Sequence, residues 1–226
     1  MFDRLIQIID ENNFNKIKNV KVLIVGIGGV GGYALEALVR SGVEDITIVD
    51  GDTVSLSNLN RQIIATQNTI NKEKIIVAKD RVLEINPNIK INTINKFIDK
   101  DNINELFANS FDYIIDACDT ITTKVLLIKY ALERNIKIIS CMGTGNRLEP
   151  EKLTITNLNK TNNDPLAKVM RKLLKESNIK LNIPVVWSNE LPIKISSRIP
   201  GSCVTVPMTA GALLASYIIK DILKNW

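Results

Sequence analysis

The feature that most restricts the fold is a glycine-rich turn, Gly26–Gly31 (GIGGVG), between a strand-like and a helix-like segment. The β-branched run Lys21–Val25 precedes the turn, and apolar residues at helical spacing follow it over Val30–Arg40. Glycines permit a tight turn and a close approach of the backbone to a phosphate, and the helix N-terminus supplies free N–H groups. The pattern predicts a nucleotide-binding unit. The alternative is a turn used only for close packing of the helix on the strand.

Strand-like and helix-like segments alternate over the first two thirds of the chain. This order predicts an α/β fold, a Rossmann-like, doubly wound and mainly parallel sheet with an elaborated C-terminal part. The expected strands are Lys21–Val25, Ile46–Val49, Lys90–Ile94, Tyr113–Ala117, Lys137–Ser140, Leu153–Asn157 and Ile183–Ser188. The expected helices are Val30–Arg40, Lys72–Ile85, Asp101–Phe107, Thr122–Arg134, Pro165–Glu176 (with Asp164 as N-cap) and Pro207–Lys224.

A length of 226 residues with 45% hydrophobic content suits one domain, and no repeat or low-complexity linker divides it. Within this single domain, 1–226, we expect an N-terminal helical arm at residues 1–19 and a nucleotide-binding core at 20–145. Residues 146–226 form the C-terminal part, in which the segment 191–201 reads as a loop.

The absence of certain residues excludes several kinds of chemistry. The chain has no histidine, which excludes a Ser-His-Asp or Cys-His catalytic unit and any histidine-ligated metal. Its three cysteines, Cys118, Cys141 and Cys203, are far apart and form no C-x-x-C pair, so they cannot build a four-cysteine zinc site. Scattered thiols of this kind usually serve as small buried apolar side chains.

The ends and the charge of the chain indicate where it acts. Residues 1–4 lack the basic-then-apolar pattern of a signal peptide. The apolar stretch Val204–Ile219 contains Pro207 and several hydroxyls and is shorter than the roughly 20 apolar residues of a spanning helix. We therefore expect a cytoplasmic protein without stable membrane insertion. A net charge of +5 would assist an encounter with a polyanion but does not identify one.

Three polar residues follow the glycine turn, and two of them, both cations, favour ATP over a dinucleotide. Asp50 ends the second strand, where a carboxylate can accept hydrogen bonds from ribose hydroxyls of either ligand. Arg61 lies in the polar segment 51–71, and Lys74 follows at the start of a helix. A hydride-transfer enzyme needs no such pair of cations, whereas a triphosphate cleaved at its α–β bond develops charge that they can stabilise. For Lys74 the alternative is a solvated lysine on a lysine-rich helix.

Two carboxylates close the strand Tyr113–Ala117. Asp116 lies at its end, and Asp119 follows three residues later. Ligands of open parallel sheets bind at the carboxyl ends of the strands, and carboxylates there can bind Mg²⁺ together with substrate phosphates. We expect Asp119 to be the metal ligand because it lies beyond the strand, where it is freer to face the site. For Asp116 the alternative is hydrogen bonding within the loop.

In this order the motifs resemble the ubiquitin-activating-type (ThiF/MoeB-like) adenylyltransferase superfamily. The resemblance covers residues 20–145 and includes the glycine turn, an Asp-x-Asp-Thr-Val loop that continues to Asn-x-Asn-Arg-Gln, the lysine and the Asp-x-x-Asp pair. It implies ATP and Mg²⁺ as ligands. The ATP-binding residues that follow are Gly26, Gly28, Gly29, Asp50, Asp52, Asn58, Arg61, Gln62 and Lys74, with Asp119 on the metal. The catalytic residues that follow are Arg61, Lys74, Asp119 and Arg4.

The N-terminal match concerns subunit organisation. Arg4, in Phe2-Asp3-Arg4, occupies the place of a family arginine that reaches into the partner subunit's site. The resemblance thus implies a homodimer, with dimer or substrate contacts in the C-terminal part, residues 146–226.

Two C-terminal segments resemble the tRNA threonylcarbamoyladenosine dehydratases. These are the Asp-Pro-Leu-Ala segment 164–167 and the Val-Val-Trp-Ser-Asn-Glu segment 185–190, in which Trp187 and Asn189 depart from the more usual Tyr and Thr. The branch that adenylates ubiquitin-like sulfur carriers usually carries two C-x-x-C pairs and often an acceptor cysteine. The chain lacks such pairs, and a packed thiol is the simpler interpretation of Cys203.

The second resemblance implies a tRNA carrying threonylcarbamoyladenosine as substrate. Its threonine carboxylate would be adenylated by ATP, and the ureido group of the same nucleoside would then close a ring and release AMP. Because the nucleophile is internal, the enzyme needs no thiol. Two alternatives remain at this point: adenylation of a ubiquitin-like carrier or peptide C-terminus, and a nicotinamide-dependent or non-catalytic nucleotide-binding protein. A sulfur-relay protein is a further candidate partner.

Overall fold

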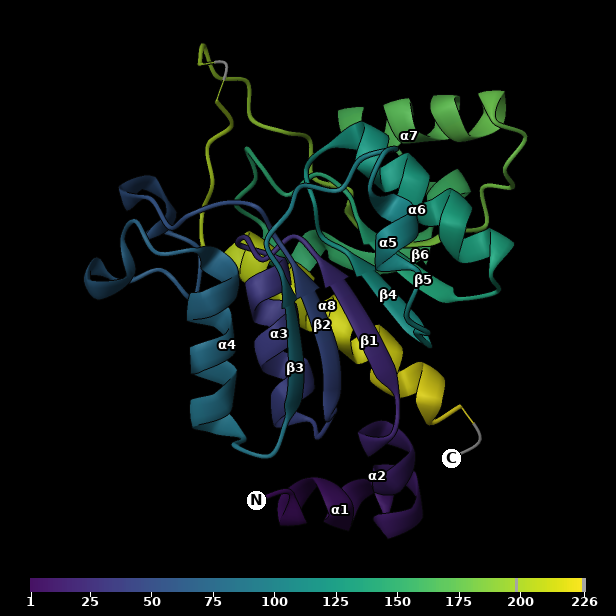
Figure 1. Ribbon diagram of the computed structural model, residues 1–226. Coiled ribbons are helices and arrows are strands. Elements are labelled where there is room, and N and C mark those ends of the chain that lie inside the picture. The colour runs from purple at the N-terminus through teal and green to yellow at the C-terminus, as the bar shows by residue number, and fades with distance from the viewer. Residues whose placement is uncertain (198, 225–226) are drawn as a thin grey trace.

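A seven-stranded sheet runs through the centre of the molecule (Figure 1). The computed structural model describes residues 1–197 and 199–224, so residue 198 of the predicted loop and the last two residues of the chain lie outside the described residues. The strand order is β3-β2-β1-β4-β5-β7-β6, and β6 pairs with β7 in antiparallel fashion while the other neighbours are parallel. The predicted Rossmann-like, mainly parallel fold is confirmed.

The elements follow the predicted order, and their ends differ from the predicted ones by at most about two residues. The strands are β1 Lys21–Val25, β2 Asp45–Val49, β3 Lys90–Ile94, β4 Tyr113–Asp116, β5 Lys137–Cys141, β6 Leu153–Asn157 and β7 Pro184–Ser188. The helices are α1 Asp3–Ile9, α2 Glu11–Lys18, α3 Gly31–Arg40, α4 Lys74–Ile85, α5 Ile103–Leu106, α6 Ile121–Glu133, α7 Pro165–Glu176 and α8 Thr205–Ile222. Short 3₁₀ turns lie at Leu56–Asn58, Gln67–Thr69, Pro150–Lys152 and Leu158–Lys160.

Two helix starts differ from the prediction for local reasons. Helix α4 begins at Lys74 rather than Lys72, because the backbone carbonyl of Lys72 accepts a hydrogen bond from Val54 N at 2.8 Å. Helix α8 begins two residues before Pro207, because a proline in the first helical turn costs no intrahelical hydrogen bond.

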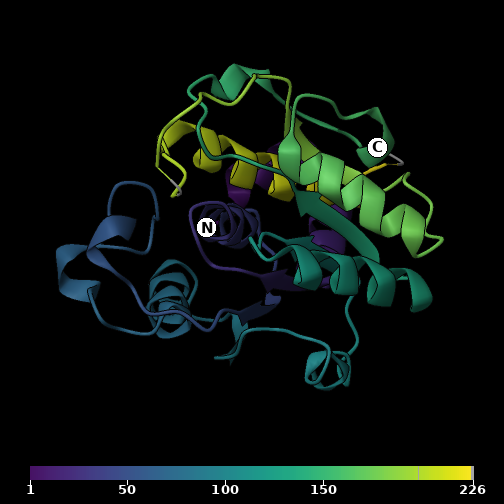
Figure 2. The same ribbon diagram turned by 90° about the horizontal axis from the view of Figure 1, so that it is seen from above.

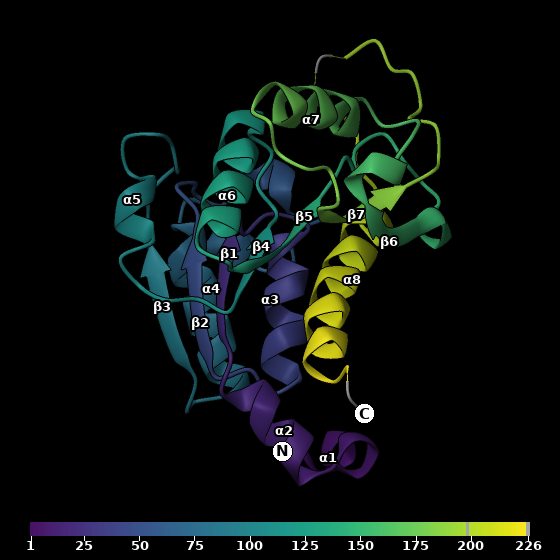
Figure 3. The same ribbon diagram turned by 90° about the vertical axis from the view of Figure 1, so that its right-hand side faces the viewer.

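Helices cover both faces of the sheet (Figures 1 and 3). Helices α3, α4 and α8 pack on one face, and α5, α6 and α7 lie on the other. Alternate residues of β1 enter the two cores: Val22 and Ile24 join the α3/α8 side, and Leu23 and Val25 join the α6/α7 side. A strand buried on both faces explains why β1 reads as a continuous apolar run rather than an alternating one.

The chain reverses its direction of travel across the sheet between β1 and β4. It moves from β1 outward to β2 and β3, then returns to add β4 on the opposite side of β1. The crevice beyond the carboxyl ends of β1 and β4 is the usual ligand position in such sheets. The topology therefore places the residues after β1 and the residues after β4 beside one another.

None of the helices formed by residues 1–197 and 199–224 is long and apolar enough to cross a membrane.

Helix α8 depends on close packing against α3, the helix that follows the glycine turn. A Cβ atom added at Gly211 would lie 2.4 Å from the Val30 carbonyl oxygen and 2.8 Å from Tyr33 Cβ. Helix α8 can therefore approach α3 this closely only with glycine at this position.

We expect Gly211→Ala to lower the free energy of unfolding by about 1–2 kcal/mol, because the clash outweighs the gain in helix propensity. The matched control is Gly32→Ala in α3, where the added Cβ would lie 3.2 Å from Ile63 Cγ2 and can be accommodated by a small side-chain shift. Urea denaturation measures both. Equal stability of the two variants would contradict the close-packing argument.

Candidate nucleotide-binding site

The glycine turn packs against the end of β4 through its backbone. Gly26 has φ +90°, and a Cβ there would lie 2.7 Å from the Ala117 carbonyl oxygen. A Cβ at Gly31 would lie 1.8 Å from Gly26 O, so neither position accepts a side chain. At Gly28 the nearest atom to an added Cβ is 3.8 Å away, which leaves the backbone there open to a ligand. The turn therefore serves both close packing and ligand binding. Gly26 and Gly31 allow the close packing, and this packing fixes the position of Gly28, whose backbone is open to a ligand.

Asp50 is fixed by the turn that it faces. Its carboxylate accepts hydrogen bonds from Ile27 N at 2.7 Å and from Asp52 N at 2.8 Å. Each carboxylate oxygen keeps a further lone pair, so the group can still accept hydrogen bonds from ribose hydroxyls. The position of Asp50 and its remaining acceptor lone pairs fit the predicted contact with the ribose of a nucleotide.

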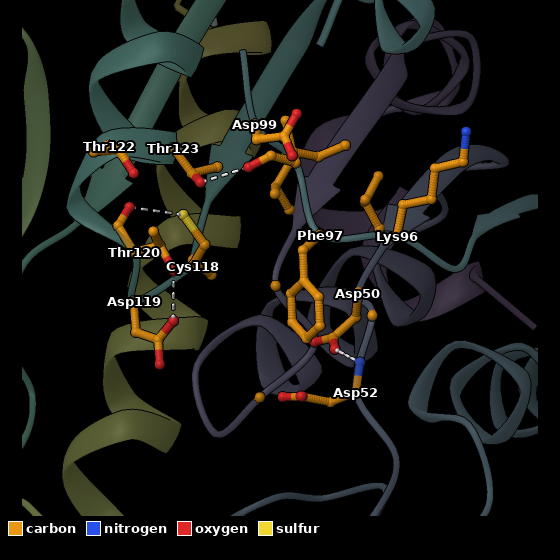
Figure 4. Close-up of a pocket in the computed structure, with 17 residues that line it drawn as sticks. Asp50, Asp52, Lys96, Phe97, Asp99, Cys118, Asp119, Thr120, Thr122 and Thr123 are labelled. Atoms are coloured by element: carbon orange, nitrogen blue, oxygen red, sulfur yellow. Dashed lines mark hydrogen bonds between the residues drawn. The ribbon is translucent and has the colours of Figure 1, made fainter. Parts of the chain in front are cut away.

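A cavity of about 340 Å³ lies in front of Asp50, within the size range of small-ligand pockets. Figure 4 shows the segment 118–123 on one side and Phe97, Asp50 and Asp52 on the other. The Phe97 ring covers Gly51, where a Cβ would lie 2.8 Å from the ring, and it is 66% exposed towards solvent. Phe97 and Asp50 line the same cavity, so the exposed ring can stack on the planar base of a nucleotide whose ribose contacts Asp50.

A second cavity of about 440 Å³ adjoins the first and contains Arg61. Ala117, Cys118 and Asp119 line both cavities, so the exposed Asp119 stands where they meet. The Arg61 guanidinium donates to Ser57 O at 2.7 Å and to Asn60 Oδ1 at 3.0 Å. Asp116, by contrast, is fully buried, which leaves Asp119 as the carboxylate of this pair that faces the site.

Lys74 is not a solvated lysine. It is 5% exposed, and its Nζ donates to Asp52 Oδ2 at 2.8 Å. Asp52 lines the first cavity, so Lys74 reaches the edge of the cavity through this carboxylate.

Gln62 and Asn58, the other two predicted site residues of the 51–71 segment, are buried and line neither cavity. Gln62 is 6% exposed, its Oε1 has no hydrogen-bond partner, and its amide lies beside Gly28. Asn58 is buried and accepts from Ser55 N at 3.0 Å, which holds the 3₁₀ turn that precedes Arg61. In this structure Asn58 therefore supports the loop from behind.

Arg4 is the one predicted site residue that the fold separates from the others. It is exposed on α1, which lies at the opposite end of the molecule from the carboxyl ends of the strands (Figure 1). A single chain therefore does not bring Arg4 to its own nucleotide pocket.

Comparisons with known proteins agree with this geometry. A model described as "ThiF family" matches residues 2–224. The chain belongs to the ThiF family. It is 36% identical over 234 residues to a Bacillus subtilis protein named tRNA threonylcarbamoyladenosine dehydratase, covering 96% of this chain and 92% of that protein. The predicted family membership is confirmed.

Solved structures of an E. coli relative extend the comparison to three dimensions. The E. coli tRNA N6-threonylcarbamoyladenosine dehydratase in complex with ATP superposes on this ThiF-family chain with a TM-score of 0.93 at 31% identity. That match covers 99% of this chain and 94% of the E. coli chain. The same enzyme in complex with AMP gives a TM-score of 0.94.

A buried ion pair supports the Asp119 loop of this ThiF-family protein. Lys124 of α6 is 1% exposed, and its Nζ lies 3.1 Å from both oxygens of Asp116 and donates to Cys141 O at 2.8 Å. Although burial acts to lower it, the Asp116 carboxylate and nearby groups raise the pKa of Lys124 above its ordinary value. The lysine stays charged at neutral pH and joins the ends of β4 and β5 behind the two cavities.

The environments of the three thiols differ. Burial and the Asp116 carboxylate raise the pKa of Cys118 above its ordinary range, and burial raises the pKa of Cys141 to about 12. Both are therefore protonated at neutral pH. Cys203 is half-buried, and hydrogen bonding with Thr205 at 3.3 Å lowers its pKa.

Two parts of the site were not predicted. Phe97 follows β3 in a polar stretch, and its position directly after a strand end was the available signal. The Lys124–Asp116 pair had no such signal, because Lys124 lies in the first turn of α6, eight residues after Asp116, where a lysine is usually solvated.

We expect Lys124→Met to lower the free energy of unfolding by about 3–5 kcal/mol, because it leaves the Asp116 charge buried without a partner. Adding Asp116→Asn should recover part of the loss, since the uncompensated charge is then removed. Denaturant unfolding of the four proteins of this double-mutant cycle measures the coupling. Additive effects would show that the two side chains act independently.

Proposed function

We propose that this ThiF-family chain is an ATP-dependent enzyme that dehydrates threonylcarbamoyladenosine in tRNA to its cyclic form. The observation that carries the proposal is the pair of joined cavities. A nucleotide placed against Asp50 extends past Asp119 toward Arg61, and the second cavity leaves room for a carboxylate beside the α-phosphate. The close relatives are named for this reaction.

The proposed reaction requires ATP and the threonyl carboxylate to lie side by side in the two cavities. A carboxylate oxygen of the threonyl group attacks the α-phosphorus of ATP, and the bond to the departing pyrophosphate breaks. The ureido group of the same nucleoside then attacks the activated carbonyl, and AMP leaves with the carboxylate oxygen. The nucleoside loses one water in total. Because both steps are favoured by orientation, the protein contributes mainly positioning and charge stabilisation.

The charged residues divide this work. Arg61 can exchange its present acceptors, Ser57 O and Asn60 Oδ1, for phosphate oxygens in a bidentate grip. Lys74, now paired with Asp52, can place its charge on the departing pyrophosphate. Mg²⁺ is commonly held by one or two carboxylates together with substrate phosphates, and we propose Asp119 as that carboxylate.

The backbone at Gly28 supports a phosphate contact at the glycine turn. The nearest atom to a Cβ added at Gly28, the Gln62 amide nitrogen, is 3.8 Å away, and Gly28 lines the first cavity. Phosphate oxygens can therefore approach the Gly28 backbone. This feature favours the proposed ATP-binding set.

We also propose the finer organisation that the family resemblance implies. The enzyme acts in the cytoplasm as a homodimer, with Arg4 of one subunit reaching the site of the other. Residues 146–226 supply substrate and dimer contacts, and a sulfur-relay protein is a further partner. The exposed position of Arg4, far from its own nucleotide pocket, supports the dimer.

We expect Arg61→Ala and Asp119→Ala each to slow adenylation by roughly 10²–10³-fold, because each removes a group that stabilises transition-state charge. AMP and pyrophosphate release from ATP with modified tRNA measures the rate, and nucleoside mass spectrometry detects the loss of water. Arg40→Ala and Asp101→Ala remove exposed charges outside the site and serve as controls.

Two outcomes of that assay would decide against the proposal. Wild-type protein that turns over ATP without changing the nucleoside mass would exclude the dehydratase function. ATP–pyrophosphate exchange stimulated by a carrier ending in Gly-Gly, without tRNA, would favour the alternative of carrier-protein adenylation.

The Arg4 proposal has a complementation test. Arg4→Ala and Asp119→Ala proteins should each be nearly inactive, but after subunit exchange a 1:1 mixture should regain about one quarter of the wild-type rate. Half of the dimers are then mixed, and each mixed dimer has one complete site. A mixture that stays inactive after verified exchange would place Arg4 outside the partner's site.

A further inference from the structure

The net charge of the chain is concentrated in one segment. Residues 160–199 contain eight of the 29 Lys and Arg residues but three of the 24 acids, so this segment carries a charge of +5. The remaining chain has 21 residues of each sign and is neutral. One of the eight, at position 198, lies outside the described residues.

The acids of this segment do not offset its exposed cations. Asp164 is buried and pairs with Arg147 at 3.4 Å, and Glu190 is buried and accepts from Leu148 N and Glu149 N. Only Glu176 is exposed, at the far end of α7. Lys168, Lys175 and Lys194 are all exposed, and none has an ion-pair partner among residues 1–197 and 199–224.

Two of these cations line a groove of about 810 Å³ between the first turns of α7 and the strap 191–197, and Lys175 lies further along the same helix, seven residues after Lys168. Lys168 lines it from the helix and Lys194 from the strap. Figures 2 and 3 show α7 and the strap on the same side of the molecule, above the carboxyl ends of the strands. The cationic groove is therefore on the same side as the nucleotide site.

Asn146 holds both the strap and Gly201, which follows the strap in the chain. Its carbonyl accepts from Ile193 N at 2.7 Å, its side chain accepts from Gly201 N at 2.6 Å, and its own N–H donates to Gly201 O at 2.8 Å. A Cβ at the preceding Gly145 would lie 2.9 Å from Pro200 Cβ, so Pro200 also packs closely on this loop. Backbone hydrogen bonds and close packing therefore fix the strap side of the groove.

The groove adjoins the second cavity. Gly145 and Leu166 line the second cavity, while their chain neighbours Asn146 and Pro165 line the groove. A substrate whose carboxylate reaches Arg61 can therefore extend past these residues into the groove. There it would meet the exposed cations Lys168 and Lys194, which have no ion-pair partner among the described residues.

We propose that this groove binds the sugar-phosphate backbone of the tRNA next to the modified nucleoside. Phosphates would lie against Lys168, Lys175 and Lys194, and the strap's exposed Leu191, Ile193 and Ile195 would contact unstacked bases of the loop. An RNA backbone that is covalently joined to the reacting carboxylate matches the positive charge of the groove and its position beside the second cavity. The inference rests on the proposed function for the identity of the RNA.

The test compares two triple variants with the same net charge. K168E/K175E/K194E reverses the groove, and K79E/K100E/K220E reverses three lysines outside the 160–199 segment that likewise lack ion-pair partners among the described residues. tRNA with and without the modification is titrated over a range of salt. The groove variant should bind at least about tenfold more weakly at low salt, and its log–log salt slope should fall by about 2–3, while the control changes little.

Two further measurements separate the inference from the function on which it rests. ATP affinity should be unchanged in both variants, which shows that the site is intact, and with modified tRNA the groove variant should raise KM far more than it lowers kcat. If the wild type dehydrates the nucleoside but both variants bind tRNA alike, the inference is overturned and the function stands. If the wild type binds tRNA through the groove without dehydrating it, the function fails and the inference stands.

Discussion

The close backbone contact between the glycine turn and the end of β4 is the constraint on which the site depends. Gly26 and Gly31 permit it, since a side chain at either position would collide with a backbone carbonyl. The contact brings the residues after β1 and the residues after β4 to one crevice, where Asp50 and Asp119 face each other across a cavity. The nucleotide pocket forms because this contact holds the end of β1 against the end of β4, although the two strands are distant in sequence.

Buried charges then hold the surrounding loops in place. Lys124 joins Asp116 to the end of β5, and Arg147 joins Asp164 to the loop that contributes Gly143 and Gly145 to the second cavity. Such pairs contribute little net stability compared with apolar packing, but the loss of one partner is costly. Their main effect here is to fix loop positions, and Asp164 acts in this way without lining either nucleotide cavity.

Much of the fold and part of the site could be predicted. The order of elements, the helix starting at Pro165 and the position of Asp50 follow from periodicity, capping residues and the glycine motif, which act over short distances. Asn58 is predicted as a ligand contact, and that stays a prediction; the structure shows in addition that its side chain holds a turn by accepting from Ser55 N, because amides in loops often satisfy the backbone. Phe97 was missed because its one local signal, a position shortly after a strand end, does not distinguish an exposed ring beside a cavity from one elsewhere on the surface.

The sequence by itself determined the fold class, the nucleotide-binding turn and the residue types available for chemistry, since each depends on near neighbours or on composition. The tertiary structure alone decided which charges are buried, which carboxylate faces the cavity and which cations line a groove. Lys74, Lys124 and Lys168 are the same residue type on three helices, and only the fold gives them different roles. Lys74 pairs with Asp52 at the edge of the first cavity, Lys124 forms a buried ion pair with Asp116, and Lys168 lines the groove. Burial and long-range contacts assign these roles because electrostatic interactions depend on distance and solvent access.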